Sequence, residues 1–167
     1  MKRILIVAVF TASLSGPAMA LEPITPAGAM EVYDTALKSY SCVDYDKAFR
    51  LFQGNADKGH ALSQYMVGVM LSAGQGAQED DKAAFDWFMR AGKQNLADAH
   101  YALGDMLKKG EGVEKNPAEA LFWFQMAANQ GHSLAKDMVN SLTASLPAAQ
   151  VEQALQKVRE HQAQAAR

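Results

Sequence analysis

The sequence predicts an all-α fold, an α-solenoid of antiparallel helix-turn-helix repeats with a capping helix at each end. Three observations lead to this class. A pattern of apolar and small residues returns every 36 residues, each copy holds two segments with helical spacing, and strand-like alternation is missing. Because one helix pair cannot bury its own apolar stripe, we expect successive pairs to stack and share a continuous core.

The first 20 residues predict a secretory signal peptide. Lys2 and Arg3 precede an apolar run of 11 residues (4–14), and Ala18-Met19-Ala20 is typical of a cleavage site. The run is far shorter than the roughly 20 residues needed to span a bilayer. We therefore expect cleavage after Ala20 and an exported mature chain (21–167), periplasmic or secreted, without stable membrane insertion.

Residues 21–44 form an N-terminal segment that is expected to contain the first capping helix. The helix is predicted over Ala27–Tyr40, from four apolar residues with helical spacing, Met30, Tyr33, Ala36 and Leu37. Cys42 is the only cysteine, which excludes an intramolecular disulfide and a cysteine-cluster metal site. We expect its thiol to be half-buried among apolar residues, with an intermolecular disulfide as the alternative.

The repeats occupy residues 45–146, in units 45–80, 81–116 and 117–146. The first helix of a unit carries a small residue, two large apolar residues and a second small residue, and its three copies are Ala48, Leu51, Phe52 and Ala56; Ala84, Trp87, Phe88 and Gly92; and Ala120, Trp123, Phe124 and Ala128. The second helix agrees in two copies, Ala61, Ser63, Tyr65, Val67, Gly68, Met70 and Leu71, then Ala97, Ala99, Tyr101, Leu103, Gly104, Met106 and Leu107.

Glycines recur at fixed places in the unit. Gly59, Asn95 and Gly131 are expected to end the first helices of the units in the left-handed conformation. Gly74 and Gly110 are expected to end the second helices in the same way. A phosphate loop needs its glycines before a helix, so Gly110-Glu111-Gly112 indicates a helix end and not a nucleotide site. The mid-helix glycines Gly68 and Gly104 predict close helix packing, with Trp87 and Trp123 filling the space between units.

These residues resemble the Sel-1-like repeat family, a relative of the tetratricopeptide repeats. The family pattern, A-x-x-W-(Y/F) followed by Q-G-x-A and G-x-G-V, is matched closely by Ala84–Val113 and less completely by Ala48–Ala77. The third unit matches from Ala120 to Gly131 and then departs. The resemblance implies an adaptor scaffold that holds a protein or peptide partner on the solenoid surface.

The departure of the third unit is typical of a terminal repeat, which has no following neighbour. Asp137 stands at the tyrosine position and Asn140 at the glycine position of the second helix. Residues 147–167 then predict a C-terminal capping helix, whose apolar face carries Val151, Leu155 and Val158.

Charge and histidine spacing make several function classes poor candidates. The mature chain keeps 14 basic against 18 acidic residues, which does not suit a nucleic-acid binder. No two of the four histidines are three or four residues apart, so we expect no local metal site and no cofactor. The acidic run Glu79-Asp80-Asp81 is expected to cap the next helix rather than to perform catalysis.

Partner-binding candidates come from first-helix positions that vary between the units. They are Arg50, Asp86, Met89, Arg90, Phe122 and Met126. Phe122 and Met126 are four residues apart, and apolar residues in an otherwise polar row are a candidate docking patch. The alternative is that the C-terminal helix covers both side chains.

We therefore expect an exported interaction scaffold that is not an enzyme. The resemblance also leaves open a secreted enzyme acting on cell-wall or β-lactam compounds. A cluster of titratable groups in one groove would favour that alternative, and the repeat alignment shows none. A structural oligomer linked through Cys42 is a third hypothesis.

Overall fold

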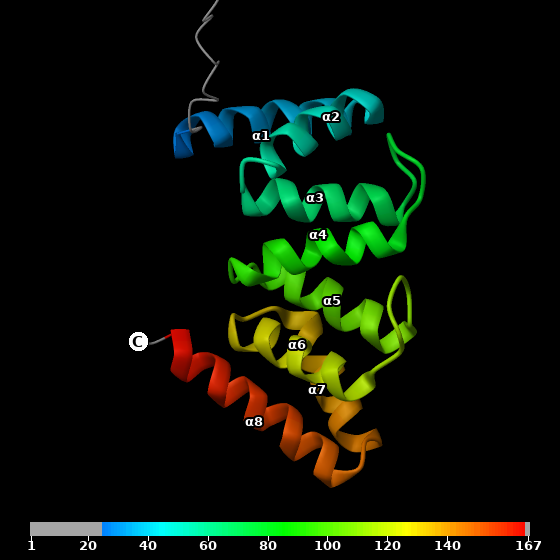
Figure 1. Cartoon of the computed structure of the whole chain (residues 1–167), viewed down its shortest axis with the longest axis vertical. Coiled ribbons are helices and arrows are strands. Elements are labelled where there is room, and N and C mark those ends of the chain that lie inside the picture. Colours follow the sequence, from blue (N-terminus) through cyan, green and yellow to red (C-terminus); the bar gives the residue numbers. More distant parts are fainter. Residues whose placement is uncertain (1–24, 166–167) are drawn as a thin grey trace, which may run out of the picture.

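The computed structural model describes residues 25–165, which form eight α-helices and no strand (Figure 1). The predicted signal peptide lies outside the described residues. Within 25–165, no helix is both long and apolar enough to cross a membrane. The helices are α1 (Pro26–Ser41), α2 (Tyr45–Ala56), α3 (Ala61–Ser72), α4 (Asp81–Lys93), α5 (Ala97–Lys109), α6 (Pro117–Asn129), α7 (Ser133–Ser145) and α8 (Ala148–Ala165).

The helices from α1 to α6 stack in chain order along the long axis of the molecule (Figure 1). α2, α4 and α6 begin at Tyr45, Asp81 and Pro117, the first residues of the three predicted units. α3, α5 and α7 are the second helices of those units. The packing is closest across the unit boundaries, between α3 and α4 and between α5 and α6. This arrangement confirms the predicted solenoid.

The mid-helix glycines make this close packing possible, as the sequence predicts. A Cβ atom on Gly68 would lie 2.6 Å from the ring of Phe88 in the next helix. A Cβ atom on Gly104 would lie 2.8 Å from the ring of Phe124 in the same way. Real Cβ atoms do not approach a ring this closely, so each glycine provides the space that a phenylalanine of the next unit occupies.

The prediction that the tryptophans fill the space between units was wrong for Trp87 and correct for Trp123. Trp87 is only half-buried, and the guanidinium carbon of Arg90 lies 4.3 Å from its ring centroid. Trp123 is buried, but it packs on the ring of His100 and not on a glycine. A helix turns about 100° per residue, so the phenylalanine that follows each tryptophan faces the glycine instead.

The helix ends agree with the predicted glycine positions. Left-handed backbone occurs at Gly59, Gly74, Asn95, Gly110 and Gly131, with φ values of 95°, 63°, 63°, 83° and 89°. At the start of α4, the Asp80 carboxylate accepts a hydrogen bond of 2.9 Å from the backbone N–H of Ala83. The predicted capping role of the acidic run is thereby confirmed for Asp80.

Glutamine side chains link each unit to the next. The Gln94 amide donates to the Gln64 Oε1 atom at 2.8 Å and to the Gly59 carbonyl at 2.9 Å. One unit later, the Gln130 amide lies 3.0 Å from the Nδ1 atom of His100. His100 is fully buried, and its Nε2 atom lies 2.9 Å from the Gly92 carbonyl. Both ring nitrogens therefore have partners when the ring is neutral.

α1 is more than the predicted cap, because it packs on α2 as a second helix packs on the next unit. The rings of Tyr33 and Phe52 are 5.6 Å apart, the distance that also separates Tyr65 from Phe88. The buried Asn55 amide donates to the Ala29 carbonyl of α1 at 2.9 Å. α1 thus packs on α2 as the second helix of a preceding unit would.

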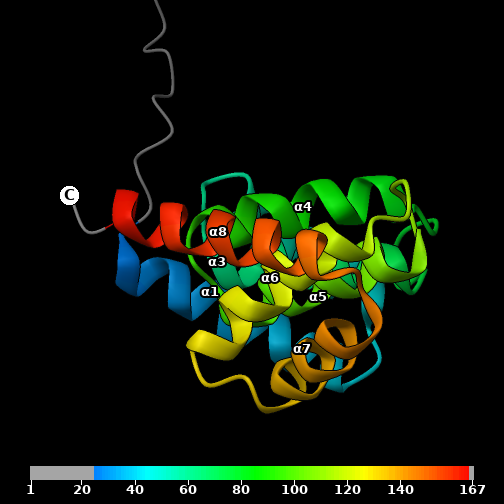
Figure 2. The same ribbon diagram turned by 90° about the horizontal axis from the view of Figure 1, so that it is seen from below.

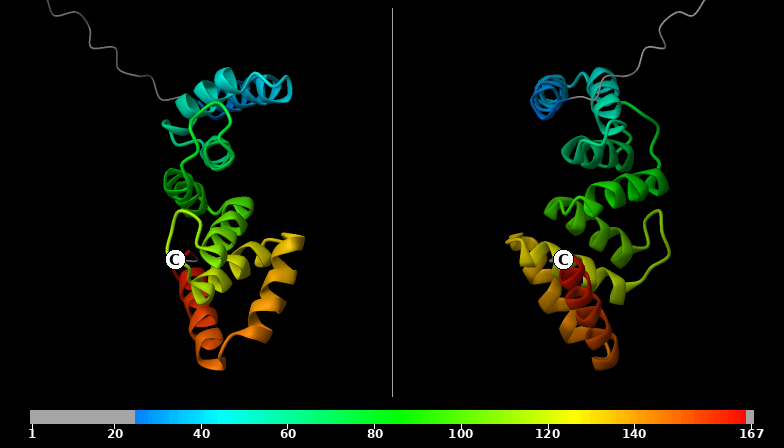
Figure 3. Two further views of the ribbon diagram at one scale, coloured as in Figure 1. Left: turned by 90° about the vertical axis from the view of Figure 1, so that its right-hand side faces the viewer. Right: turned by 60° about the vertical axis from the view of Figure 1, so that its left-hand side comes forward.

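The C-terminal cap covers α6 and leaves α7 exposed. α7 and α8 diverge from their shared turn in the left-hand view of Figure 3, and both pack against α6, on different sides of it in Figure 2. Ala154 and Val158 form the buried contact of α8. Asp137 and Asn140 of α7 are exposed, because no further unit stacks on them.

Cys42 lies in the short turn between α1 and α2. Its side chain is exposed to solvent, so the expectation of a half-buried thiol was wrong. The turn is too short to fold over the thiol, since α2 begins three residues later. An intermolecular disulfide stays a prediction.

Candidate functional site

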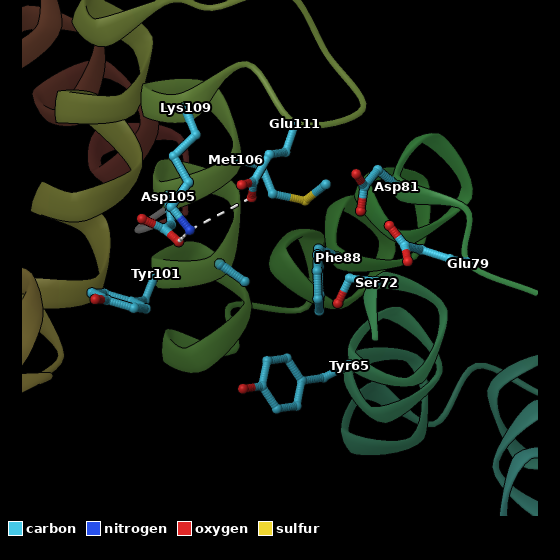
Figure 4. A pocket seen from close by; sticks show the side chains of 11 residues that line it. Tyr65, Ser72, Glu79, Asp81, Phe88, Tyr101, Asp105, Met106, Lys109 and Glu111 are labelled. Atoms are coloured by element: carbon cyan, nitrogen blue, oxygen red, sulfur yellow. Dashed lines mark ion pairs between the residues drawn. The ribbon is translucent and has the colours of Figure 1, made fainter. Parts of the chain in front are cut away.

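A groove between α3 and α5 is the candidate site (Figure 4). Its cavity volume is about 380 Å³, within the range of known ligand pockets. Phe88 of α4 contributes to its floor, where it packs on Tyr65. The remaining lining residues come from both second helices, from the loops that follow them and from the start of α4, namely Ser72, Glu79, Asp81, Tyr101, Ala102, Asp105, Met106, Lys109 and Glu111.

Tyrosine side chains form one end of the groove. Tyr65 and Tyr101 occupy the same position of α3 and α5, and both are half-buried. The Tyr101 ring packs on Phe124 with centroids 5.4 Å apart, as Tyr65 packs on Phe88. Tyr33 of α1 continues the row. These three pairs repeat one contact, so the stacking of the units itself aligns the tyrosines.

The hydroxyl groups of Tyr33, Tyr65 and Tyr101 make no hydrogen bond within residues 25–165. Burial raises the pKa of Tyr33, and the nearby Asp34 and Asp98 carboxylates raise it further. Burial and the Asp98 carboxylate raise the pKa of Tyr65 as well. The hydroxyls of Tyr33 and Tyr65 therefore stay protonated. Each can donate a hydrogen bond to a ligand or accept one from it.

Asp98 and His132 lie beside the tyrosine row. The His132 ring stacks on Tyr101, with centroids 4.5 Å apart and planes 13° from parallel. The Nε2 atom of His132 lies 3.6 Å from the Asp98 carboxylate. The tyrosine end of the groove thus has aromatic faces, with the exposed carboxylate of Asp98 beside them.

Carboxylates gather at the other end of the groove, near the loops (Figure 4). Lys109 is the one cation that lines it, and its Nζ atom lies 2.7 Å from Asp105 and 3.6 Å from Glu111. The hydrogen bond that its ammonium donates to the Asp105 carboxylate raises the pKa of Lys109, which keeps the ammonium charged. Glu79 and Asp81 form no ion pair among residues 25–165.

The glycine pair in the loop after α5 explains how Glu111 and Asp81 come to line the same groove. Gly110 ends α5 with a φ of 83°, and Gly112 has a φ of 65°. A Cβ atom on Gly112 would overlap the carbonyl of Asp81, so only glycine can pack there. The loop after α5 therefore folds back onto the start of α4 and brings Glu111 to the groove that Asp81 lines.

Four of the predicted binding residues lie on first helices and not in this groove. Arg50 of α2 and Asp86 and Arg90 of α4 are exposed, and Met89 is half-buried. Arg90 covers the Trp87 ring. The structure does not bring these four residues into the tyrosine-lined groove, and their role in binding stays a prediction.

The predicted apolar docking patch is not accessible. Phe122 and Met126 are buried, with 9% and 5% of their surface exposed. The Phe122 ring lies 6.1 Å from the ring of His161 in α8, edge to face. The alternative expectation, that the C-terminal helix covers the patch, is correct for Phe122, and Met126 is buried as well.

The sequence analysis missed the groove residues as a site because it assigned the tyrosines to packing. The spacing of Tyr101, Asp105 and Lys109 places these residues on one face of α5, and that signal could have found the groove. Their closeness to Glu79 and Asp81 depends on the loop path, which the spacing does not show.

The histidines in the described part of the chain make structural contacts. His60 and His132 cap α3 and α7 by accepting hydrogen bonds from backbone N–H groups, and His100 links two units. Among residues 25–165, no three His, Cys, Asp or Glu side chains cluster closely enough to hold a metal ion.

Solved structures with similar folds contain the same kind of repeat. A protective antigen of uropathogenic Escherichia coli, which displays an SLR fold, is 26% identical with a TM-score of 0.76, over 79% of this chain and 29% of the antigen. A Sel1 repeat protein of Oxalobacter formigenes is 27% identical with a TM-score of 0.65, over 68% of this chain and 46% of that protein. This chain thus spans less than half the length of either protein.

A third structure supports the fold alone. Cysteine-rich protein B of Helicobacter pylori is 18% identical with a TM-score of 0.54, over 68% of this chain and 97% of that protein. No curated protein sequence matches the chain.

The Sel1 repeat model matches residues 43–60, 61–96 and 97–132. The match 43–60 contains α2 alone, whereas 61–96 and 97–132 each run from a second helix to the following first helix, the pairs that pack most closely in the structure. α7 and α8 lie beyond the match, as expected for the second helix of a terminal unit and for the C-terminal cap. Because the matched residues make up more than half of the sequence, the chain belongs to the Sel1 repeat family.

Proposed function

We propose that the protein is an exported scaffold that binds a protein or peptide partner in the groove between α3 and α5. The carrying observation is the row of half-buried tyrosines, whose hydroxyls have no hydrogen-bond partner among residues 25–165. Sel1 repeat solenoids generally serve as scaffolds for protein–protein interaction, which supports the proposal. Export rests on the signal peptide predicted from residues 1–20.

Tyrosine is well suited to such a surface. A half-buried ring has already lost much of its rotamer freedom, so it presents a large contact area at little further entropic cost on binding. The hydroxyl at its rim can form a hydrogen bond with a peptide backbone. Tyr65 and Tyr101 are fixed by Phe88 and Phe124, which makes the surface rigid before a partner arrives.

Site-specific photocrosslinking tests the location of the site. A photoreactive residue at Ala102, which lines the groove, should give a crosslinked partner in the envelope of cells that produce the protein. The same residue at exposed Asp86 of α4 should not. Crosslinks at position 86 but not at 102 would place binding on the first helices and contradict the groove.

An enzyme acting on cell-wall or β-lactam compounds is the second candidate, because the groove gathers titratable groups. The geometry favours it less. Lys109 is held in its charged form, which is unsuitable for a base or a nucleophile. The Glu111 side chain is 49% exposed, whereas a general-acid carboxyl is typically placed in an apolar pocket. Hydrolysis of either substrate class by the purified chain, lost in Lys109→Met, would reverse this ranking.

A further inference from the structure

We infer that the partner segment is cationic: an extended stretch bearing Lys or Arg, whose charged side chain enters the loop end of the groove between Glu79, Asp81 and Glu111. Its neighbouring side chains then lie along Tyr65 and Tyr101. This inference rests on the proposed function and adds the chemistry of the ligand.

The charge balance of the groove carries the first step. Four carboxylates and one ammonium line it, which leaves a net negative charge at the loop end. The side chain of Asp80 is occupied in capping α4, whereas the neighbouring Asp81 carboxylate has no such role and lines the groove. Like charges held near one another are unfavourable until a cation joins them.

Lys109 shows what these carboxylates bind. Its ammonium lies between Asp105 and Glu111, at 2.7 and 3.6 Å, so the groove already holds one cation of the proposed kind. Glu79 and Asp81 come from the opposite wall, after α3 and at the start of α4 (Figure 4). They have no ion-pair partner within residues 25–165. A second cationic group from a partner would complete the pattern.

The tyrosine end provides the second, independent observation. Lys and Arg carry long apolar stems, which bury well against aromatic faces while the charged head reaches polar groups. The rings of Tyr65 and Tyr101 provide such faces, and their hydroxyls have no partner within the described residues. An acidic segment would meet the same rings but would be repelled by Glu79, Asp81 and Glu111.

The test uses short fluorescein-labelled peptides of alternating Lys and Ala, with Glu–Ala and Gln–Ala peptides for comparison. The mature chain should bind the Lys–Ala peptide in preference to both. The variant E79Q/D81N/E111Q should bind it about tenfold more weakly, since three carboxylates that line the groove are neutralised. Raising the salt concentration should weaken the wild-type complex in the same direction.

A matched control separates the groove from the overall charge. The variant E31Q/D46N/E114Q removes the same number of carboxylates from exposed positions that do not line the groove. It should bind within about twofold of wild type, because none of the three lines the groove and exposed charges outside a binding site are largely screened by salt. Equal losses in both variants, or no binding of the Lys–Ala peptide to wild type, would overturn the inference.

One more variant distinguishes failure of the cationic-ligand inference from failure of the proposed binding site. Ala102→Gln places a larger neutral side chain in the groove without removing a core residue. If the Gln–Ala peptide binds as tightly as the Lys–Ala peptide and A102Q weakens both, the groove binds peptides but does not select cations. If A102Q leaves Lys–Ala binding unchanged, the groove is not the site and both proposals fail. Urea denaturation of each variant checks that it is folded.

Discussion

The ring of Phe124 occupies the position that a side chain on Gly104 would need, with its Cδ1 atom 2.8 Å from the place of the missing Cβ. Phe124 is completely buried and also packs on Tyr101, so its ring has little room to move. This contact, and the equivalent contact of Gly68 with Phe88, fixes the spacing between successive units.

Gly104→Ala should therefore lower the stability of the fold. Alanine favours a helix by up to about 1 kcal/mol over glycine, but forcing a methyl group into a packed core costs about 1 to 3 kcal/mol. We expect a net loss of about 1 kcal/mol in the free energy of unfolding, measured by urea denaturation.

Gly54→Ala is the control for this substitution. Gly54 lies in the interior of α2, and a Cβ atom there would meet nothing within 4 Å. The change should stabilise the protein by about 0.4 to 1 kcal/mol. If G104A were as stabilising as G54A, the close packing of α5 on α6 would be wrong.

The two tryptophans should differ in their contribution to stability. Trp123 is 8% exposed, so Trp123→Ala should lower the free energy of unfolding by about 3 to 5 kcal/mol. Trp87 is half-buried with Arg90 over its ring, so Trp87→Ala should cost clearly less, about 1 to 2 kcal/mol. Thermal denaturation of both variants measures the order, and equal losses would contradict the burial difference.

His100 should make the fold less stable in acid. Burial lowers the pKa of its imidazole in the folded state, while the unfolded chain has a pKa of about 6.5. The unfolded state therefore binds the proton first. The stability contributed by neutral His100 is complete above pH 6.5 and is lost as the pH falls from there toward the lowered pKa.

Two substitutions at this position test the explanation. Gln64 occupies the same place one unit earlier and accepts a hydrogen bond from Gln94. His100→Gln should therefore keep the link to Gln130 and reduce the loss of stability between pH 7 and pH 5. Burial also lowers the pKa of His60, so this residue would account for the loss of stability that remains in the H100Q variant. His100→Leu should cost about 1 to 3 kcal/mol at neutral pH, because buried polar groups lose their partner. An unchanged pH profile in H100Q would refute the assignment to His100.

Val158→Asp should detach the C-terminal cap. Val158 is 4% exposed in the contact between α8 and α6, and a buried carboxylate there has no partner. The variant should expose Phe122 and Met126 and bind a hydrophobic dye more strongly than wild type. Ala149→Asp, at an exposed position in the first turn of α8, should leave dye binding unchanged.

Cys42 should react with a thiol reagent in the native protein, because its side chain is exposed. One equivalent should react without denaturant, as measured by absorbance. Non-reducing electrophoresis of the oxidised protein tests the predicted intermolecular disulfide, with Cys42→Ser as the control. A thiol that reacts only in denaturant would contradict the exposed turn.

The sequence predicted the repeating helix pairs because their contacts are set by local spacing. The starts of α2, α4 and α6 follow from a constant period, and the left-handed positions at Gly59 and Asn95 follow from residue type. The role of α1 was missed, since Tyr33 precedes Phe52 by 19 residues whereas Tyr65 precedes Phe88 by 23. The shorter turn after α1 shifts the register, so comparison at a period of 36 does not align the two pairs.

The candidate site was harder to predict because it depends on contacts between distant segments. α8 folds back over α6 and covers Phe122, a path that no local pattern specifies. Glu111 reaches the groove because Gly112 packs on the carbonyl of Asp81. The periodic pattern identifies the glycine but not the backbone that it contacts.

The pairing of each helix with its neighbours in the chain also bears on how the protein folds. From α1 to α7, every extensive helix contact joins consecutive helices. The contact of α8 with α6 skips only one helix of the chain. Such a low contact order keeps the entropy of loop closure small, so the chain can fold quickly by growth from any one pair. If the chain is exported in an unfolded state, as the proposed signal peptide suggests, it could then fold without first forming contacts between its N- and C-terminal segments.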